Sequence, residues 1–203
     1  MTLLETRFRA PTEDDRDDRL VATHRTREQL DAGLAAIREA PCEVGTLELI
    51  ACRPALYERA VLDAAALDVD GGLVGDSWIS RPSKTPDRAP LLDAQVTLMN
   101  ARAIALIAGD RDRWPIAGDQ LYVDLDLSLD NLPPGTRLQI GDAVLEVSAL
   151  PHTGCAKFSA RFGADSARWI NTPTGRALNL RGINARVVSS GQVRRGDAIR
   201  KLA

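Results

Sequence analysis

One cysteine of the chain, Cys155, lies at a position where we expect its thiol to be chemically reactive. Cys155 follows the turn sequence LPHTG and begins the stretch CAKFSARF, for which we expect a helix. At the N-terminus of a helix, unpaired backbone N–H groups and the helix dipole favour a thiolate. Lys157 and Arg161 lie in the next turns and act in the same direction. The pattern predicts a nucleophilic or metal-binding thiol, and the alternative is a small buried hydrophobic residue.

Polar residues on both sides of Cys155 are candidates to assist it. His152 is a candidate base or anion contact, and its alternative role is that of a hydrogen-bonded structural histidine. Only three of the 26 basic residues are lysines, so we expect an oxyanion site to be built mainly from arginine guanidinium groups. The candidate cofactor contacts are therefore His152, Thr153, Lys157, Arg161, Arg176 and Arg181. For the arginines, the alternative is ordinary ion pairing at the surface.

The remaining metal-ligating residue types form no convincing site. Cys42 and Cys52 are scattered, the cysteine count is odd, and there is no C-x-x-C pair, which argues against a disulfide framework or a structural zinc ion. We interpret both cysteines as structural. Asp124, Asp126 and Asp130 alternate with apolar residues, so they are expected to form the solvated face of a strand rather than a metal cluster.

Composition narrows the class of protein. The chain has 203 residues, 44% of them hydrophobic, which suffices for one domain with an extension. A formal net charge of -2 gives no electrostatic footprint for nucleic acid. No apolar run is long enough for a membrane helix, and the N-terminus lacks the apolar core of a signal peptide. We expect a cytoplasmic protein that binds neither nucleic acid nor membrane.

The elements that must position Cys155 are mostly short strands. From Gly45 onward, β-like runs alternate with turn signals, and helical patterns interrupt them only at NARAIALIAG and between Cys155 and about Ile170. The predicted strands lie in GTLELIACRP, RAVLDAAALD, QVTLMN, DQLYVDLDL, TRLQIG, AVLEVSAL, NARVVSSG and DAIRKL. The fold class is therefore mainly β with a few helices, arranged as a barrel or a sandwich.

Other segments are expected to connect or extend this body. Residues 1–25 are dense in charge and predict a solvated arm, whereas TREQLDAGLAAIREAP carries a capping box and predicts a helix. Residues 80–90 predict a mobile loop. The Gly-Asp pair occurs five times, and most of these pairs are expected to be turns; the pair in LQIGDAVLEV predicts a two-residue hairpin.

The order of these segments resembles that of the MOSC domain, which occurs at the C-terminus of molybdenum cofactor sulfurases and in stand-alone bacterial proteins. The resemblance rests on GLVGDSW, QVTLMN, the hairpin in TRLQIGDAVLEVS, the single cysteine behind it, and RGINARVVSSGQVRRGDAIRKL. It implies a MOSC-type β-barrel with an N-terminal helical extension. The expected domains are residues 1–44, a polar arm and helix, and residues 45–203, the barrel.

The resemblance also implies a role for the thiol. Cys155 aligns with the motif cysteine that carries sulfur or contacts molybdenum, so the implied cofactor is molybdenum cofactor (molybdopterin) and the implied metal ligand is Cys155. Two positions depart from the family pattern: Gly154 replaces the usual proline before the cysteine, and Gln120 replaces the usual asparagine in an acidic–Asn–Leu sequence. The chain has no room for the aminotransferase-like domain of the sulfurases, so pyridoxal phosphate would belong to a separate sulfur donor.

Three functions remain open from the sequence. The first is a module that binds molybdenum cofactor or carries sulfur on Cys155, supplied by a donor enzyme of the cysteine desulfurase type. The second is an enzyme, a molybdenum-dependent reductase of N-hydroxylated or other oxidised small molecules that receives electrons from a separate electron-transfer protein. The third is a non-catalytic interaction domain. The substrate and the oligomeric state are left undetermined.

Overall fold

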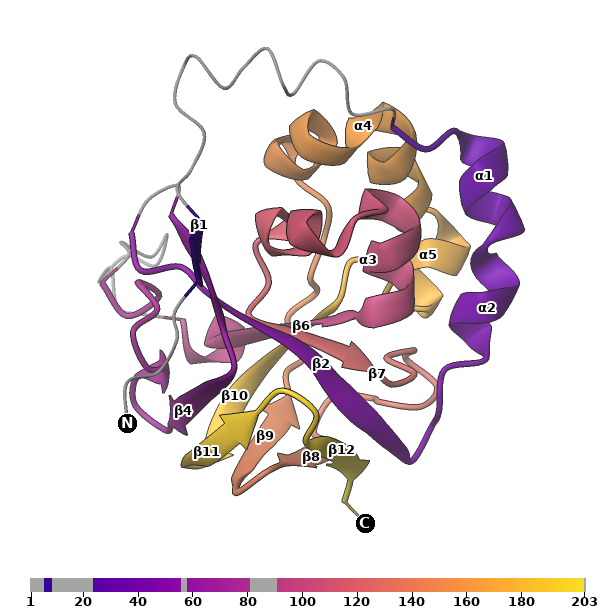
Figure 1. Ribbon diagram of the computed structural model, residues 1–203. Helices are drawn as coiled ribbons and strands as arrows, with labels where there is room; N and C mark the ends of the chain where they lie inside the picture. Colours follow the sequence, from indigo (N-terminus) through magenta and orange to yellow (C-terminus); the bar gives the residue numbers. More distant parts are fainter. Residues whose placement is uncertain (1–5, 9–23, 56–57, 81–90, 203) are drawn as a thin grey trace.

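A closed barrel forms the body of the protein (Figure 1). The computed structural model describes residues 6–8, 24–55, 58–80 and 91–202. Seven strands pair in a ring and the last returns to the first, because β7 pairs with both β6 and β2. In ring order they are β2 (Val44–Cys52), β12 (Ala198–Lys201), β8 (Arg137–Ile140), β9 (Ala143–Val147), β10 (Ile183–Ser189), β6 (Val96–Asn100) and β7 (Leu121–Asp124). The prediction of a mainly β barrel with a few helices is confirmed.

The remaining strands extend the barrel at its edges. β3 (Arg59–Leu62) pairs with β2, and β1 (Thr6–Phe8) pairs with β3. A separate small sheet contains β11 (Gly191–Arg194), β4 (Ala64–Asp68) and β5 (Gly72–Leu73). The β6–β7 pair is parallel, and all other pairs are antiparallel.

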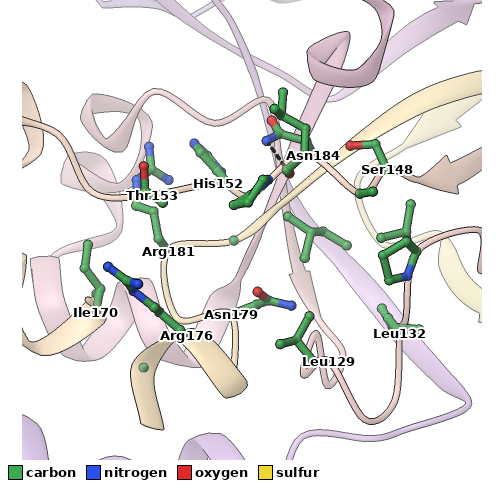
Figure 2. A pocket seen from close by; sticks show the side chains of 18 of the residues that line it. Leu129, Leu132, Ser148, His152, Thr153, Ile170, Arg176, Asn179, Arg181 and Asn184 are labelled. Carbon is green, nitrogen blue, oxygen red and sulfur yellow. Dashed lines mark hydrogen bonds between the residues drawn. The ribbon is translucent and has the colours of Figure 1, made fainter. Parts of the chain in front are cut away.

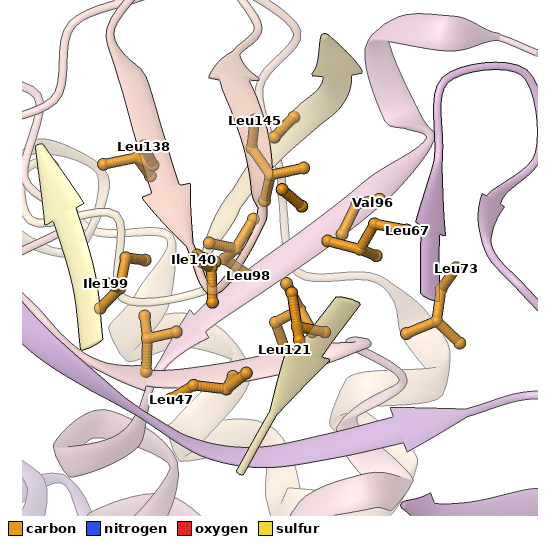
Figure 3. Packing of buried hydrophobic residues seen from close by; sticks show 14 of the residues in the cluster. Leu47, Leu67, Leu73, Val96, Leu98, Leu121, Leu138, Ile140, Leu145 and Ile199 are labelled. Atoms are coloured by element: carbon orange, nitrogen blue, oxygen red, sulfur yellow. The ribbon is translucent and has the colours of Figure 1, made fainter. Parts of the chain in front are cut away.

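Alternating side chains explain why the short strands close on themselves. In the hairpin β8–β9, every second residue is buried, and the predicted two-residue turn is present because Ile140 pairs with Ala143. Gly141 in this turn has φ 52°, and a Cβ there would collide with the carbonyl of Gln192. The inward residues of the seven barrel strands meet in one apolar core (Figure 3), where Leu98, Leu121 and Leu145 are fully buried.

The helices gather on one side of the barrel (Figure 1). They are α1 (Arg27–Ala32), α2 (Leu34–Arg38), α3 (Ala101–Ala108), α4 (Ala156–Ile170) and α5 (Pro173–Ala177), together with the 3-10 helix η4 (Arg111–Ala117). The 3-10 helix η3 (Leu92–Ala94) instead contacts β10. A second apolar core lies between the gathered helices and the barrel, and its largest fully buried side chains are Tyr122, Phe158, Phe162 and Trp169. No helix in the described part of the chain has the length and apolar character required to cross a membrane.

The predicted N-terminal helix is present as two short helices. Thr26 and Gln29 form the expected capping box. The helix is interrupted at Gly33, where a Cβ would lie 2.5 Å from the side chain of Leu106. α1 packs on α4, and the indole N–H of Trp169 donates to Asp31 at 3.0 Å. The extension therefore covers the helix that begins at Cys155.

Two expectations about local structure are wrong. Residues 6–8 belong to β1 rather than to a solvated arm; the rest of that predicted arm, up to residue 23, lies outside the described residues, as does the loop at 81–90. The predicted solvated aspartate face does not form, because β7 ends at Asp124, which accepts two hydrogen bonds from Arg102. Asp126 instead accepts from Ser128 in the following turn. The domain boundary at 44/45 remains a prediction.

Candidate functional site

Cys155 is the N-cap residue of α4, as the sequence predicts. Its backbone is extended (φ -117°, ψ 172°), and its carbonyl accepts from the N–H groups of Phe158 and Ser159 at 3.0 and 3.1 Å. Cys155 is exposed. The alternative of a small buried hydrophobic residue therefore does not describe Cys155.

The surroundings of Cys155 favour its ionised form. Partial burial raises the pKa of the thiol, but other groups outweigh that effect and hold the pKa of Cys155 below its ordinary value. The strongest of them are the backbone N–H groups of Phe158 and Lys157, followed by the charges of Arg181 and Arg161. Because the thiolate is the nucleophile and the metal ligand, this lowered pKa increases the fraction of the cysteine in its reactive form.

Helix α4 is bent behind the thiol. Gly163 interrupts it with φ 87° and ψ 162°, a backbone conformation almost restricted to glycine. A Cβ at this position would lie 2.8 Å from Nδ1 of His24, so His24, which precedes α1, packs against the bend. Because of this bend, the first half of α4, which begins at Cys155, has a different direction from the second half, which packs on α1.

A buried ion pair lies next to the thiol. Arg181 donates from Nη1 to Oδ2 of Asp119 at 2.6 Å, and the two side chains are 8% and 0% exposed. The guanidinium carbon of Arg181 also lies 5.0 Å from the centroid of the Phe158 ring, in the first turn of α4. One side chain thus connects the loop before β7, the segment before β10 and the helix that carries Cys155.

His152 completes this cluster as a neutral imidazole. Its Nδ1 lies 3.5 Å from Oδ1 of Asp119. The pKa of His152 is lowered from 6.5 to about 4, first by burial and then by the charge of Arg181, and the charge of Asp119 only partly opposes these effects. Oδ1 of Asp119, Nδ1 of His152 and Nε of Arg181 are all buried without a hydrogen-bond partner in the described residues. Three polar atoms of this cluster therefore lack the hydrogen bonds that buried polar atoms normally make.

Arginines also surround the end of η4. Five successive carbonyl oxygens there each accept a hydrogen bond from a different side chain. The pairs are Trp114 with Tyr122 (2.7 Å), Pro115 with Arg59 (3.2 Å), Ile116 with Arg161 (2.6 Å), Ala117 with Arg181 (3.1 Å) and Gly118 with Arg53 (2.8 Å). Partial negative charge collects at the carbonyl end of a helix. The carbonyl end of η4 therefore gathers four guanidinium groups, and two of them, those of Arg161 and Arg181, act on the Cys155 thiol.

Two of the five Gly-Asp pairs provide the acids of this cluster. Gly75 and Gly118 have φ of 88° and 97°, and the aspartates that follow them are buried. Asp76 accepts from Nε and Nη2 of Arg53 at 2.8 and 3.0 Å, and Asp119 accepts from Arg181. The sequence signals a turn at both places, but nothing in it marks these aspartates as buried partners of arginine.

The two departures from the family pattern have structural reasons. Gln120 is fully buried, and its side chain accepts from both the N–H and the hydroxyl group of Thr97 while donating to the carbonyl of Gln95 at 3.3 Å. It therefore stabilises the β6–β7 connection rather than contacting a ligand. Gly154 approaches the end of α4, where a Cβ would lie 2.7 Å from Ile170. A larger residue before Cys155 would require the side chains of Ile170 and Asn171 to move.

A pocket of about 360 Å³ opens beside the cluster (Figure 2). Its wall includes His152, Thr153, Arg176 and Arg181, but not Cys155. In Figure 2, Leu129 and Leu132 lie toward one end of the pocket, and Ile170, Thr153 and Arg181 lie toward the other.

The structure divides the predicted site residues into two groups. Arg161 and Arg181 act on the Cys155 thiol, and the backbone of Lys157 does so as well. Thr153 and Arg176 instead line the pocket. Arg181 lines the pocket as well, and so does His152, which lies next to Asp119. Sequence reasoning missed Arg53, Arg59, Asp76 and Asp119. Of the other cysteines, Cys52 is buried as expected for a structural residue, whereas Cys42 is exposed.

Comparisons with known proteins agree with this fold. The model of the MOSC domain family matches residues 90–200, which is more than half of the chain. The crystal structure of the YuaD protein from Bacillus subtilis is similar with a TM-score of 0.56 and 20% identity over 77% of this chain and 94% of that one. The crystal structure of YiiM from Escherichia coli is similar with a TM-score of 0.50 and 16% identity over 78% and 70%. Comparison with curated proteins gives no match.

Proposed function

The chain belongs to the MOSC domain family, which has a general association with molybdenum cofactor, and we propose that it binds this cofactor through the thiolate of Cys155. The observation that carries the proposal is the position of the thiol. It is exposed at the N-terminus of α4, where backbone N–H groups and two arginines hold its pKa below the ordinary value.

The residues present fit such a group. A thiolate is a soft ligand of the kind that molybdenum in a sulfur-rich cofactor accepts. The three buried polar atoms of Asp119, His152 and Arg181 that lack partners in the described residues provide both donor and acceptor capacity nearby. The lowered pKa of His152 keeps the imidazole neutral, so this ring does not compete with the arginines for an anion.

Each residue of the cluster has a separate task in this proposal. Cys155 would hold the metal, while Lys157, Arg161 and Arg181 would hold the anionic part of the cofactor. Asp119 orients Arg181 through their 2.6 Å ion pair and is a positioning residue. When bound, the cofactor supplies a metal that exchanges electrons and oxygen or sulfur atoms with a substrate.

The exposure of the thiol also supports a second candidate function, that of a sulfur carrier. The thiolate of Cys155 would attack the outer sulfur of a persulfide on a donor enzyme. A new S–S bond forms on Cys155, the S–S bond of the donor breaks, and the donor cysteine leaves as a thiolate. Pyridoxal phosphate belongs to the donor in this scheme, and no further oxidant is required.

Anaerobic purification of the full chain tests both functions together. We expect bound molybdenum and pterin in the wild-type protein and their loss in Cys155→Ser, and the matched control Cys42→Ser retains both. A gain of one sulfur atom on the Cys155 peptide, without metal, would support the carrier instead. An unmodified Cys155 peptide together with no bound molybdenum, from cells that make the cofactor, would overturn both proposals.

A further inference from the structure

The pocket beside the cluster has its own recognition chemistry, although Cys155 does not line it. Its volume of about 360 Å³ is typical of sites for small organic molecules, which range from about 300 to 1,000 Å³. It lies between the segment that follows β9, residues 148–153, and the segment from α5 to the start of β10.

One wall of the pocket is apolar. Leu132, Val147 and Ile183 line it and are buried, and Leu129 lines it as an exposed residue at 49%. Ile170, at the end of α4, lies toward the opposite end in Figure 2. The apolar part of an organic ligand can therefore contact apolar side chains at both ends of the pocket.

The charge of the lining has one sign. Two arginines, Arg176 and Arg181, line the pocket, and no aspartate or glutamate does. Arg181 is already paired with Asp119. Arg176 is exposed and makes no side-chain hydrogen bond or ion pair with the described residues. An uncompensated guanidinium at the edge of an apolar space favours a carboxylate, which it can bind through two parallel hydrogen bonds.

Buried polar groups in the wall point to the same kind of ligand. Arg181 is 7% exposed and lines the pocket, and its Nε has no hydrogen-bond partner in the described residues; the same is true of Nδ1 of His152. Asn184 is 4% exposed and uses its Nδ2 to donate to the carbonyl of Leu150 at 3.0 Å. Buried polar groups normally have partners, so unpartnered ones in a pocket wall indicate a site that a ligand completes.

The wall is also built to keep its shape. Asn179 lines the pocket with φ 47°, and its side-chain amide donates to the carbonyl of Leu127 at 2.8 Å. Gly182 has φ 104°, where a Cβ would collide with the carbonyl of Leu98. Both residues fix the segment that places Arg181 between the thiol and the pocket.

From these observations we infer that the pocket binds a small organic anion, a carboxylate with an apolar body, whose charged group meets Arg176. The inference goes beyond the proposed function, because it requires neither molybdenum nor the thiol. A carboxylate held there lies next to the cluster through the shared residues His152 and Arg181.

Titration calorimetry of the full chain with hexanoate, benzoate and 4-phenylbutyrate tests this inference. We expect saturable binding of at least one of the three acids, and at least about tenfold weaker binding of its uncharged primary amide. Arg176→Gln should weaken the carboxylate by about tenfold and leave the amide unchanged. The matched control is Arg168→Gln, an exposed arginine on α4 that does not line the pocket.

Two further variants separate this site from the thiol. Leu129→Glu places a negative charge at the apolar end and should abolish carboxylate binding, and the high exposure of Leu129 means that folding tolerates the change. Cys155→Ser should bind the carboxylate as the wild type does, so this result does not depend on whether the chain binds molybdenum. No saturable binding of any of the three acids, or equal binding of acid and amide, would overturn the inference.

Discussion

Arg181 and Asp119 form an ion pair at 2.6 Å that is almost completely buried and connects the barrel to the helix carrying Cys155. The guanidinium of Arg181 lies over the ring of Phe158 in the first turn of α4, and Asp119 follows the left-handed Gly118 before β7. Through this pair, the position of the helix N-terminus depends on a turn that is far from it in the sequence.

Breaking this pair should destabilise the protein strongly. Arg181→Met leaves the Asp119 carboxylate buried and unpaired, so we expect a loss of about 3–5 kcal/mol in the free energy of unfolding. Arg181→Met with Asp119→Leu should lose less, because neither charge remains. Urea unfolding measures both. The control is Arg186→Gln, which removes an exposed partner of Glu146 and should cost no more than about 1 kcal/mol. A cost for Arg181→Met equal to that of the control would contradict the account.

The imidazole of His152 should titrate near pH 4. Burial lowers its pKa from 6.5 to about 4, with the charge of Arg181 as the next cause. Nitrogen NMR of the ring measures this directly, and His24→Gln assigns the signal because the chain has only two histidines. A midpoint near 6.5 for His152 would show that the ring is not in this environment.

Stability should follow the same titration. Because the unfolded state binds a proton at His152 more readily than the native state does, His152 costs no stability above pH 6.5 and costs progressively more as the pH is lowered to about 4. We expect a loss of about 3 kcal/mol over this range. His152→Gln should lack that part of the pH dependence in urea unfolding, and an unchanged slope would refute the expectation.

Gly163→Ala should destabilise the protein, although glycine to alanine inside a regular helix usually stabilises it by about 0.5–1 kcal/mol. At φ 87° and ψ 162°, alanine is strained, and we expect a loss of about 1–3 kcal/mol in thermal or urea unfolding. His24→Ala removes the neighbouring side chain but not the strain, so the double variant should recover little. A gain in stability for Gly163→Ala would mean that α4 is not bent at this residue.

The reactivity of Cys155 should depend on its arginines. Its lowered pKa predicts that alkylation by iodoacetamide reaches its plateau at a lower pH than for cysteine in a short peptide. Arg161→Gln removes a positive charge and should move this midpoint upward. Peptide mass spectrometry follows Cys155 separately from Cys42 and Cys52 and checks the result. A midpoint that stays unchanged in Arg161→Gln would remove the arginine from this role.

The sequence was sufficient to predict the barrel and the position of Cys155 at the start of a helix. Alternating apolar residues predict most of its strands, and the hairpin at Gly141 and the helix start at Cys155 follow from local turn and capping chemistry. The acids and arginines around the thiol could not be predicted, because they come together only in the tertiary fold. Asp119 looks like every other residue after a glycine turn, and Arg53 and Arg161 are distant in the chain.

The sequence also could not predict which of the candidate arginines lie next to the thiol and which line the pocket. Arg176 and Arg181 are close in sequence, yet the left-handed Asn179 and Gly182 direct the chain so that only Arg181 reaches Asp119. Such backbone reversals depend on contacts with distant segments, such as the hydrogen bond from Asn179 to the carbonyl of Leu127. A single sequence contains no local signal for them.

Reconstitution of the metal-free protein with molybdenum cofactor tests the central claim most directly. Excess cofactor released from a donor protein is added anaerobically, unbound material is removed, and the molybdenum retained per chain is measured. The account predicts close to one molybdenum per chain for the wild type and for Cys42→Ser, and almost none for Cys155→Ser. Equal retention by the wild type and Cys155→Ser would contradict the claim that the Cys155 thiolate holds the metal.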